Sequence, residues 1–331
     1  MARLGVAGTK STTLELIEQL LSDGFEPDLL ITLTPEMGEA SKVAGYKDLR
    51  RFAEENRIPV YHAESYALTA ETDKANLSRE EIDLLLVIGW QRLIPEWLLD
   101  RLRIGAFGMH GSPEPLPRGR GRSPINWALL NGKTSFVTNL FKYDAGVDSG
   151  MIVGRQKFDI NPWDDCNTLH MKNRIAMNRL LREHLSGLIA GNGRLQPQSG
   201  EVEATYFPKR TAESGRIEWD GMDMAALHNC IRAQTRPFPG AFSHLEGAAE
   251  PFYFWKGHPF DGHLVYDGAL PGTVVEVFHD GSFLVAVWDG SVRVHEYTSP
   301  DGTLPLAGQR FTRFPSRSAE SVNDLNHSAS V

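Results

Sequence analysis

Short apolar runs alternate with amphipathic helical segments along the first part of the chain. Leu4-Gly5-Val6-Ala7, residues 29–33 and residues 84–88 are apolar runs of four or five residues. A strand that is apolar at every position is buried on both faces, as in a parallel sheet. Between the first two runs, leucine and isoleucine recur at the spacing of one helix face. This alternation predicts a Rossmann-like, doubly wound and mostly parallel α/β sheet.

The same patterns place the other elements of the first half. The first helix is expected to begin at Thr12, with Glu15 completing a capping box. Residues 106–107 are expected to form a fifth strand that brings His110 to a strand end, where such sheets bind ligands. We expect further helices at 47–56, 124–131 and 165–190, and further strands at 58–61, 134–143 and 151–160.

The second half has a different pattern. After a helix near residues 227–233, short strand-like runs at 252–255, 272–278, 282–287 and 291–297 are separated by turn residues. Asp280-Gly281 and Asp289-Gly290 are typical of tight hairpins. These features predict a smaller antiparallel β-barrel. We expect domains at 1–192 and 205–312, a linker at 193–204 and a disordered tail at 313–331.

Composition excludes several classes of protein. The chain has a formal net charge of -8, which argues against a large nucleic-acid footprint. Its two cysteines are far apart and lack metal-ligand spacing, so we expect neither a disulfide framework nor a bound metal. No apolar run is long enough for a membrane span, and a cytoplasmic location is expected. Gly8-Thr9-Lys10-Ser11 lacks the earlier glycine of a phosphate-binding loop, so we expect no ATPase.

Candidate catalytic residues lie at the two ends of the segment 108–150. His110 lies between glycines, and Asp148 lies in Gly146-Val147-Asp148-Ser149-Gly150. Histidine exchanges a proton near neutral pH, and a carboxylate facing the ring orients it. The alternatives are a structural histidine and an aspartate that only shapes a turn.

Three arginines lie within five residues between these two candidates. Arg118, Arg120 and Arg122 are typical of phosphate or carboxylate recognition through the forked guanidinium group. The alternative is a solvated loop whose arginines bind nearby backbone.

With these motifs in place, the chain resembles the 10-formyltetrahydrofolate-dependent formyltransferases, the family that includes methionyl-tRNA formyltransferase and the sugar N-formyltransferases. The resemblance extends to about residue 312, so the two expected domains correspond to a catalytic domain and an OB-like barrel domain. The matching segments are His110-Gly111-Ser112, Leu116-Pro117, Ser123-Pro124, Trp127-Ala128, Asn131-Gly132, Asp144-Ala145-Gly146-Val147-Asp148-Ser149-Gly150, Tyr206-Phe207-Pro208-Lys209-Arg210-Thr211, Gly215-Arg216-Ile217-Glu218-Trp219, Arg232-Ala233 and Pro237-Phe238-Pro239-Gly240-Ala241-Phe242.

The resemblance implies roles for individual residues. His110 and Asp148 match two catalytic positions, whereas Gly108 stands where the family has an asparagine that donates to the formyl oxygen. Asn126, Asn139, Ser112 or a backbone N–H are candidate replacements. The expected acceptor-binding residues are Gly111, Ser112, Arg118, Arg120 and Arg122, and the expected pterin-binding residues are Trp90, Gln91, Arg92, Leu93, Ile94, Asp144 and Val147. Leu93 and Ile94 have the alternative of starting a packed helix.

Three functions remain open at this point. The first is formyl transfer from 10-formyltetrahydrofolate to a nucleotide-linked amino sugar. It is favoured because residues 34–49, where the tRNA enzyme has a basic insertion, carry balanced charges. The others are formylation of methionyl-tRNA, and a formyl-folate-binding protein whose catalysis is reduced or altered by Gly108. A small-molecule acceptor and a homodimer are the expected partners, without membrane or nucleic acid.

Overall fold

The computed structural model describes residues 2–313, which form two compact units. The first unit consists of residues 2–124, Ser135–Asp159 and Met171–Pro208, and the second of Ile125–Thr134, Ile160–His170 and residues 209–313. The domain limits expected from the sequence stay a prediction. The expected tail lies outside the described residues, apart from Arg313. Within residues 2–313, no helix combines the length and the apolar character that crossing a bilayer requires.

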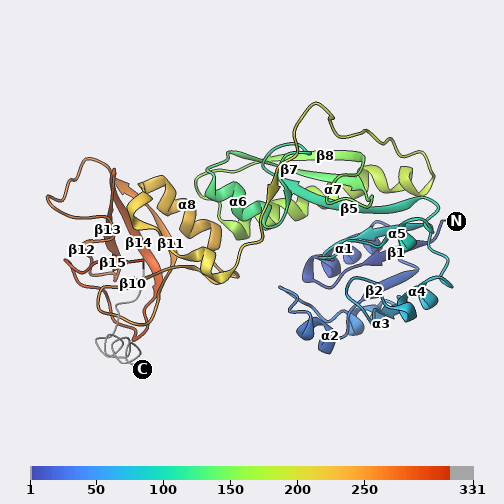
Figure 1. The fold of residues 1–331 in the computed structure, drawn as a ribbon, viewed down its shortest axis with the longest axis horizontal. Helices are drawn as coiled ribbons and strands as arrows, with labels where there is room; N and C mark the ends of the chain where they lie inside the picture. Colours follow the sequence, from blue (N-terminus) through green and yellow to red (C-terminus); the bar gives the residue numbers. More distant parts are fainter. Residues whose placement is uncertain (1, 314–331) are drawn as a thin grey trace, which may run out of the picture. The chain divides into compact units, whose positions relative to one another are not determined.

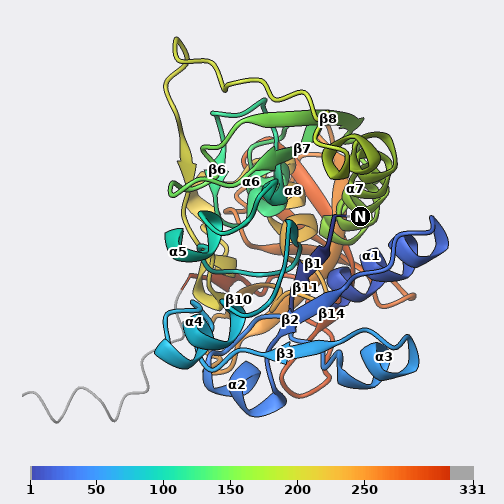
Figure 2. The ribbon, with the colours of Figure 1, turned by 90° about the vertical axis from the view of Figure 1, so that its right-hand side faces the viewer.

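A seven-stranded sheet forms the centre of the first unit, in the order β3-β2-β1-β4-β5-β7-β8 (Figures 1 and 2). The first five strands in this order are parallel, whereas β7 and β8 are antiparallel to their neighbours. The expected mostly parallel α/β sheet is therefore confirmed. The strands are β1 (Leu4–Ala7), β2 (Leu29–Thr32), β3 (Val60–His62), β4 (Leu84–Val87), β5 (Gly105–Ser112), β7 (Ser135–Lys142) and β8 (Ile152–Asp159).

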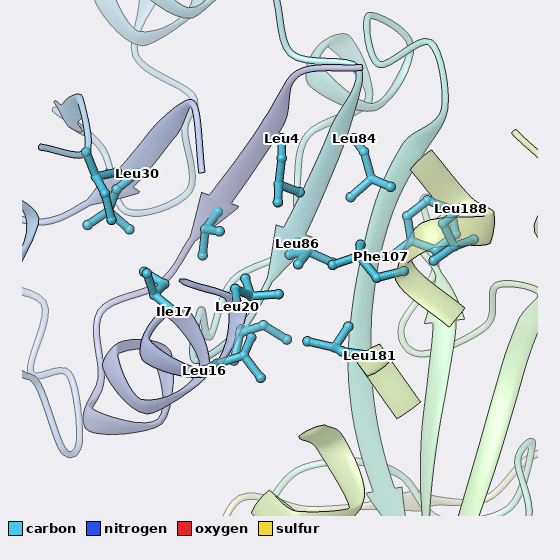
Figure 3. Packing of buried hydrophobic residues seen from close by; sticks show 14 of the residues in the cluster. Leu4, Leu16, Ile17, Leu20, Leu30, Leu84, Leu86, Phe107, Leu181 and Leu188 are labelled. Atoms are coloured by element: carbon cyan, nitrogen blue, oxygen red, sulfur yellow. The ribbon is translucent and has the colours of Figure 1, made fainter. Parts of the chain in front are cut away.

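Helices cover both faces of this sheet. Because successive strand residues point to opposite faces, Leu84 and Leu86 join one core cluster, and Leu85 and Val87 join another. The first cluster includes side chains of α1 (Ser11–Ser22), α3 (Arg50–Glu55) and α7 (Cys166–Ile189), and the second those of α4 (Glu71–Leu77) and α5 (Glu96–Leu99). Figure 3 shows α1 and α7 side chains gathered around Leu86 and Phe107. The remaining helix of the N-terminal region is α2 (Pro35–Ala40).

Two local expectations are wrong. The first helix begins at Ser11 with Lys10 as its N-cap, because the Thr13 hydroxyl accepts the Lys10 N–H and replaces the expected Thr12 cap. β5 does not end before His110 but continues to Ser112, because β7 pairs with it from Phe107 onward. Pairing between residues distant in the chain sets this strand end, and no local pattern encodes it.

The second unit contains a six-stranded antiparallel sheet, in the order β12-β13-β14-β11-β10-β15. Backbone hydrogen bonds between residues 272–274 and 308–311 connect its two edges, so the sheet closes as the expected barrel. Phe252, Phe254, Phe283 and Phe311 fill the interior. The strands are β10 (Ala241–Leu245), β11 (Phe252–Asp261), β12 (Val274–Val277), β13 (Phe283–Val287), β14 (Gly290–Thr298) and β15 (Phe311–Thr312).

Helix α8 (Met224–Gln234) packs against this barrel through Leu227 and Ile231 (Figure 1). The turns at Asp280-Gly281 and Asp289-Gly290 connect antiparallel neighbours, as expected. Strands β10 and β15 were not expected from the sequence. The remaining elements are α6 (Pro124–Leu130), the short pair β6 (Arg120–Gly121) and β9 (Tyr206–Phe207), and two 3₁₀ turns at Ala212–Gly215 and Trp219–Gly221.

Candidate active site

His110 lies where the parallel part of the sheet has ended. β4 pairs with β5 only as far as Val87, opposite Gly108, whereas β7 accompanies β5 to Ser112. His110 therefore extends past the carboxyl end of β4, the edge at which open α/β sheets bind ligands. The strand fixes its backbone, and the side chain is 9% exposed.

Both ring nitrogens of His110 face an oxygen atom. Nδ1 lies 3.4 Å from Oδ2 of Asp148, and Nε2 lies 2.8 Å from the carbonyl oxygen of Gly119. Since the carbonyl can only accept, Nε2 carries a proton in this arrangement. A ring protonated on both nitrogens satisfies both oxygens, whereas a neutral ring satisfies one. The geometry thus places an imidazole and a carboxylate within reach of one another.

The Asp148 loop is held by backbone geometry and by one glutamine. Asp148 has a φ of 50°, a left-handed conformation that aspartate tolerates better than most residues. Its Oδ2 accepts the Gly121 N–H at 3.0 Å, and Gln198 Nε2 donates to the carbonyl oxygens of Asp148 (2.7 Å) and Gly150 (2.9 Å). A Cβ on Gly150 would lie 1.6 Å from the Lys142 carbonyl oxygen, so only glycine fits there. These contacts fix the carboxylate toward His110.

The Gly119 carbonyl is placed by the segment that follows α7. Thr205 Oγ1 accepts the Gly119 N–H at 2.8 Å, and β9 pairs in parallel with β6. Gln198, from the expected linker, holds the Asp148 loop, and Thr205, at the start of the expected second domain, holds the Gly119 loop.

The three arginines have different surroundings. Arg118 pairs with Glu114 at 3.2 Å, and Arg120 donates to the Tyr206 hydroxyl at 3.0 Å and to Gln198 Oε1 at 2.7 Å. Arg122 has no side-chain hydrogen bond or ion pair within residues 2–313. Arg118 and Arg120 thus stabilise the loop, and Arg122 alone keeps an unused guanidinium group.

Lys10 is close enough to Arg122 for their charges to interact. Burial lowers the pKa of Lys10, and the positive charge of Arg122 lowers it further. No carboxylate within the described part of the chain pairs with either residue. Two adjacent cations without a counter-ion form a favourable site for an anionic group.

The residues expected to line a pterin site divide between core and surface. Trp90 and Ile94 belong to the buried cluster on one face of the sheet, whereas Leu93 and Val147 are 52% and 42% exposed. Tyr66 accepts the Gln91 N–H at 2.9 Å, and the Arg92 guanidinium lies over the Tyr66 ring. Ile94 is therefore packed in this core, and its expected contact with a pterin stays a prediction. The buried Trp90 indole nitrogen has no hydrogen-bond partner among the described residues.

Three other expected site residues have structural contacts. Asp144 Oδ1 accepts the Gly146 N–H at 3.0 Å and the Ser149 hydroxyl at 2.5 Å, which shapes the Asp148 loop. Ser112 is buried and donates to the Arg118 carbonyl at 2.7 Å, and Gly111 pairs with Thr138 in the sheet. The structure thus brings His110, Asp148 and the 119–121 loop together. Ser112 and Gly111, in contrast, make contacts within the loop and the sheet that support this group.

Sequence reasoning missed Gln198, Lys10 and Tyr143. Gln198 lies fifty residues from its partners in the Asp148 loop, and no local signal connects them. Lys10 follows the first strand, a position at the ligand-binding edge of such sheets that could have marked it. Tyr143 follows β7, and only the register of β7 against β5 reveals that it lies beside Gly108.

This arrangement suits proton transfer during acyl chemistry. An imidazole and a carboxylate share one edge of the sheet, and unpaired cations lie near the same loop. Among residues 2–313, no group of three or more histidine, cysteine, aspartate or glutamate side chains is placed to hold a metal ion.

Comparisons with known proteins give the chain its family. The fold matches an N-formyltransferase from Helicobacter canadensis, solved with folinic acid and dTDP-3-aminofucose, with a TM-score of 0.63 and 19% identity over 90% of this chain and 100% of the other. It also matches WlaRD, a sugar 3N-formyltransferase solved with dTDP and 5-N-formyl-THF, with a TM-score of 0.62 and 18% identity over 90% of this chain and 98% of the other.

A third match is HypX from Aquifex aeolicus, with a TM-score of 0.62 and 18% identity over 90% of this chain and 44% of the other. At this level of identity, the three structures establish the fold. The family model for formyl transferases matches residues 4–185, more than half of the chain. The chain therefore belongs to the formyl transferase family.

Proposed function

We propose that this protein transfers a formyl group from 10-formyltetrahydrofolate to the amine of a nucleotide-linked amino sugar. The observation that carries the proposal is the His110 ring held between the Asp148 carboxylate and the Gly119 carbonyl, in a chain of the formyl transferase family. The two similar structures, one solved with folinic acid and dTDP-3-aminofucose and the other with 5-N-formyl-THF and dTDP, support the choice of both substrates.

The proposed reaction requires one proton to be moved. The acceptor amine attacks the formyl carbon, its N–C bond forms, and the carbonyl electron pair moves to oxygen. The His110–Asp148 pair takes a proton from the amine, and the pair returns a proton to N10 of the folate as the C–N10 bond breaks. The products are the formamide and tetrahydrofolate.

The donor site is proposed near Trp90 and the Asp148 loop. The unpartnered Trp90 N–H and the exposed side chains of Leu93 and Val147 provide one polar and two apolar contacts for a pterin ring. Folate carries a flat heteroaromatic ring, which such a combination suits. Asp144 is proposed to support this site through the loop that it shapes.

The acceptor site is proposed at Arg122 and Lys10. A nucleotide-linked sugar carries a diphosphate, and two neighbouring cations without counter-ions match that charge. Arg118 and Arg120 are less suited because both already have partners. The net charge of -8 disfavours a tRNA acceptor.

The test is a product assay with purified protein, 10-formyltetrahydrofolate and a panel of dTDP-, UDP- and GDP-linked amino sugars. We expect tetrahydrofolate release and a mass gain of one formyl group on at least one sugar. Initiator methionyl-tRNA is included as a competing acceptor. Formylation of the tRNA alone, or folate binding without any product, would overturn the proposal.

A further inference from the structure

The ring of Tyr143 occupies the space beside Gly108. A Cβ on Gly108 would lie 2.3 Å from Cε2 of this ring and 2.9 Å from its hydroxyl oxygen. The Tyr143 N–H donates to the Ala106 carbonyl at 2.8 Å, and its ring stacks on Phe141 with centroids 5.2 Å apart. Gly108 thus leaves room for an aromatic ring, and any other residue there would displace it.

The hydroxyl group of Tyr143 lies over the face of β5 that also carries the His110 side chain. Gly108 and His110 are two residues apart on one strand, so their side-chain positions share a face of the sheet. Burial raises the pKa of Tyr143, and the negative charge of Asp148 raises it further. The phenol therefore keeps its proton and is an O–H donor across the neutral pH range.

This donor is unused. Within residues 2–313, the Tyr143 hydroxyl makes no hydrogen bond. The other candidate donors near this site already donate to protein acceptors. Asn139 Nδ2 donates to the His110 and Val137 carbonyls, Ser112 Oγ donates to Arg118, and the Gly121 N–H binds Asp148. Asn126, the other candidate, donates to the Ala233 carbonyl at 2.6 Å.

We propose that the Tyr143 hydroxyl is a catalytic residue that donates a hydrogen bond to the formyl oxygen. This inference rests on the proposed function. As the amine nitrogen bonds to the formyl carbon, negative charge develops on that oxygen, and the phenol stabilises it without giving up its proton. In this division of roles, His110 and Asp148 transfer the proton, and Tyr143 stabilises the oxygen. The arrangement requires glycine at position 108, because a side chain there would occupy the space of the tyrosine ring.

The direct variant is Tyr143→Phe, which removes one oxygen atom and keeps the ring. We expect kcat to fall about 10²–10³-fold, as when an oxyanion donor is lost, with little change in the affinity for 5-formyltetrahydrofolate. Tyr297→Phe is the matched control, because that hydroxyl binds the Gly281 carbonyl within the barrel of the second unit. The control is expected to keep wild-type turnover.

A reciprocal exchange tests the shared space. Tyr143→Ala empties the position, and Gly108→Asn in the same chain then supplies an amide donor without the clash. We expect the double variant to recover part of the turnover lost in Tyr143→Ala. Gly108→Asn alone is expected to lose activity, because it displaces the ring. Full activity of Tyr143→Phe would overturn the proposal.

A measurement without an acceptor separates this inference from the proposed function. The infrared stretch of a ¹³C-labelled formyl group in bound 5-formyltetrahydrofolate reports a hydrogen bond to its oxygen. We expect a shift to lower frequency in the wild type that Tyr143→Phe reverses. The same frequency in both proteins would overturn the role of Tyr143 even where the wild type forms product. A reversed shift in a protein that formylates no sugar would overturn only the acceptor assignment. Absence of folate binding would overturn both.

Discussion

Gln198 donates one hydrogen bond to the Asp148 carbonyl and another to the Gly150 carbonyl, with its Nε2 at 2.7 and 2.9 Å. The residue that holds the Asp148 loop therefore comes from the segment after α7, outside the two loops that contact His110. Catalytic groups need support that fixes their orientation to within a fraction of an ångström. In the proposed function Gln198 would provide this support, and its amide group can be tested separately from the proposed role of His110.

Replacing Gln198 by glutamate tests that alignment. Glutamate keeps an acceptor for Arg120 but cannot donate to the two carbonyls. We expect a loss of about 1–3 kcal/mol in the free energy of unfolding, from two hydrogen bonds, and a fall in kcat. Denaturant unfolding and steady-state kinetics measure the two effects. Gln309→Glu, which changes an amide in the second unit, is the control, and equal kinetics in both variants would contradict the role of Gln198.

Lys10→Met tests the proposed anion site. The pKa of Lys10 is lowered by burial and by Arg122, so its charged form is destabilised by folding. The unfolded state then binds more protons, and stability rises as pH increases from the folded to the unfolded pKa of Lys10. Methionine removes this cost. We expect a higher Tm together with a raised KM for the nucleotide sugar.

The exposed Lys47→Met is the matched control for charge and is expected to change neither Tm nor KM. Reduced salt dependence of KM in Lys10→Met provides a second readout, because the variant has one fewer cation at the site. An unchanged KM would show that the acceptor binds elsewhere.

The two cysteines give a prediction about pH that does not depend on the site. Burial raises the pKa of Cys166 to about 12 and that of Cys230 to about 11. Both thiols stay protonated at pH 8, where alkylating reagents attack the thiolate. We expect iodoacetamide to modify the native protein far more slowly than the urea-unfolded chain, as followed by mass spectrometry. Because the unfolded thiols lose their protons first, stability falls as pH rises from the ordinary thiol pKa to the raised pKa values of the folded protein. Rapid labelling of the native chain would contradict this burial.

The strands of the first unit could be predicted because local pattern determines them. Leu84–Val87 is apolar at every position, and only a strand covered on both faces buries all of it. The barrel hairpins at Asp280-Gly281 and Asp289-Gly290 could also be predicted, since the residues of a tight turn are themselves sufficient to indicate it. Strand β15 has two residues and forms by pairing with β10, so no local signal marked it.

The site was predictable only in part, for the same reason. His110 and Asp148 carry motifs, and the structure brings their side chains together. The end of β5, the position of Tyr143 against Gly108 and the hydrogen bonds of Gln198 depend on register and on contacts between distant segments. Sequence patterns therefore identified His110 and Asp148, whereas the residues that hold them in place could be found only from the structure.

The proton-transfer pair is tested most directly by the single-turnover rate of formyl transfer in the wild type and in Asp148→Asn, at saturating 10-formyltetrahydrofolate and acceptor. Asparagine keeps the size of the side chain but removes the charge that faces Nδ1 of His110. Asp301→Asn, in an exposed turn of the second unit, is the matched control. We expect Asp148→Asn to lose about 10²–10⁴-fold in rate while its affinity for 5-formyltetrahydrofolate is retained. A rate equal to that of the wild type would contradict the account.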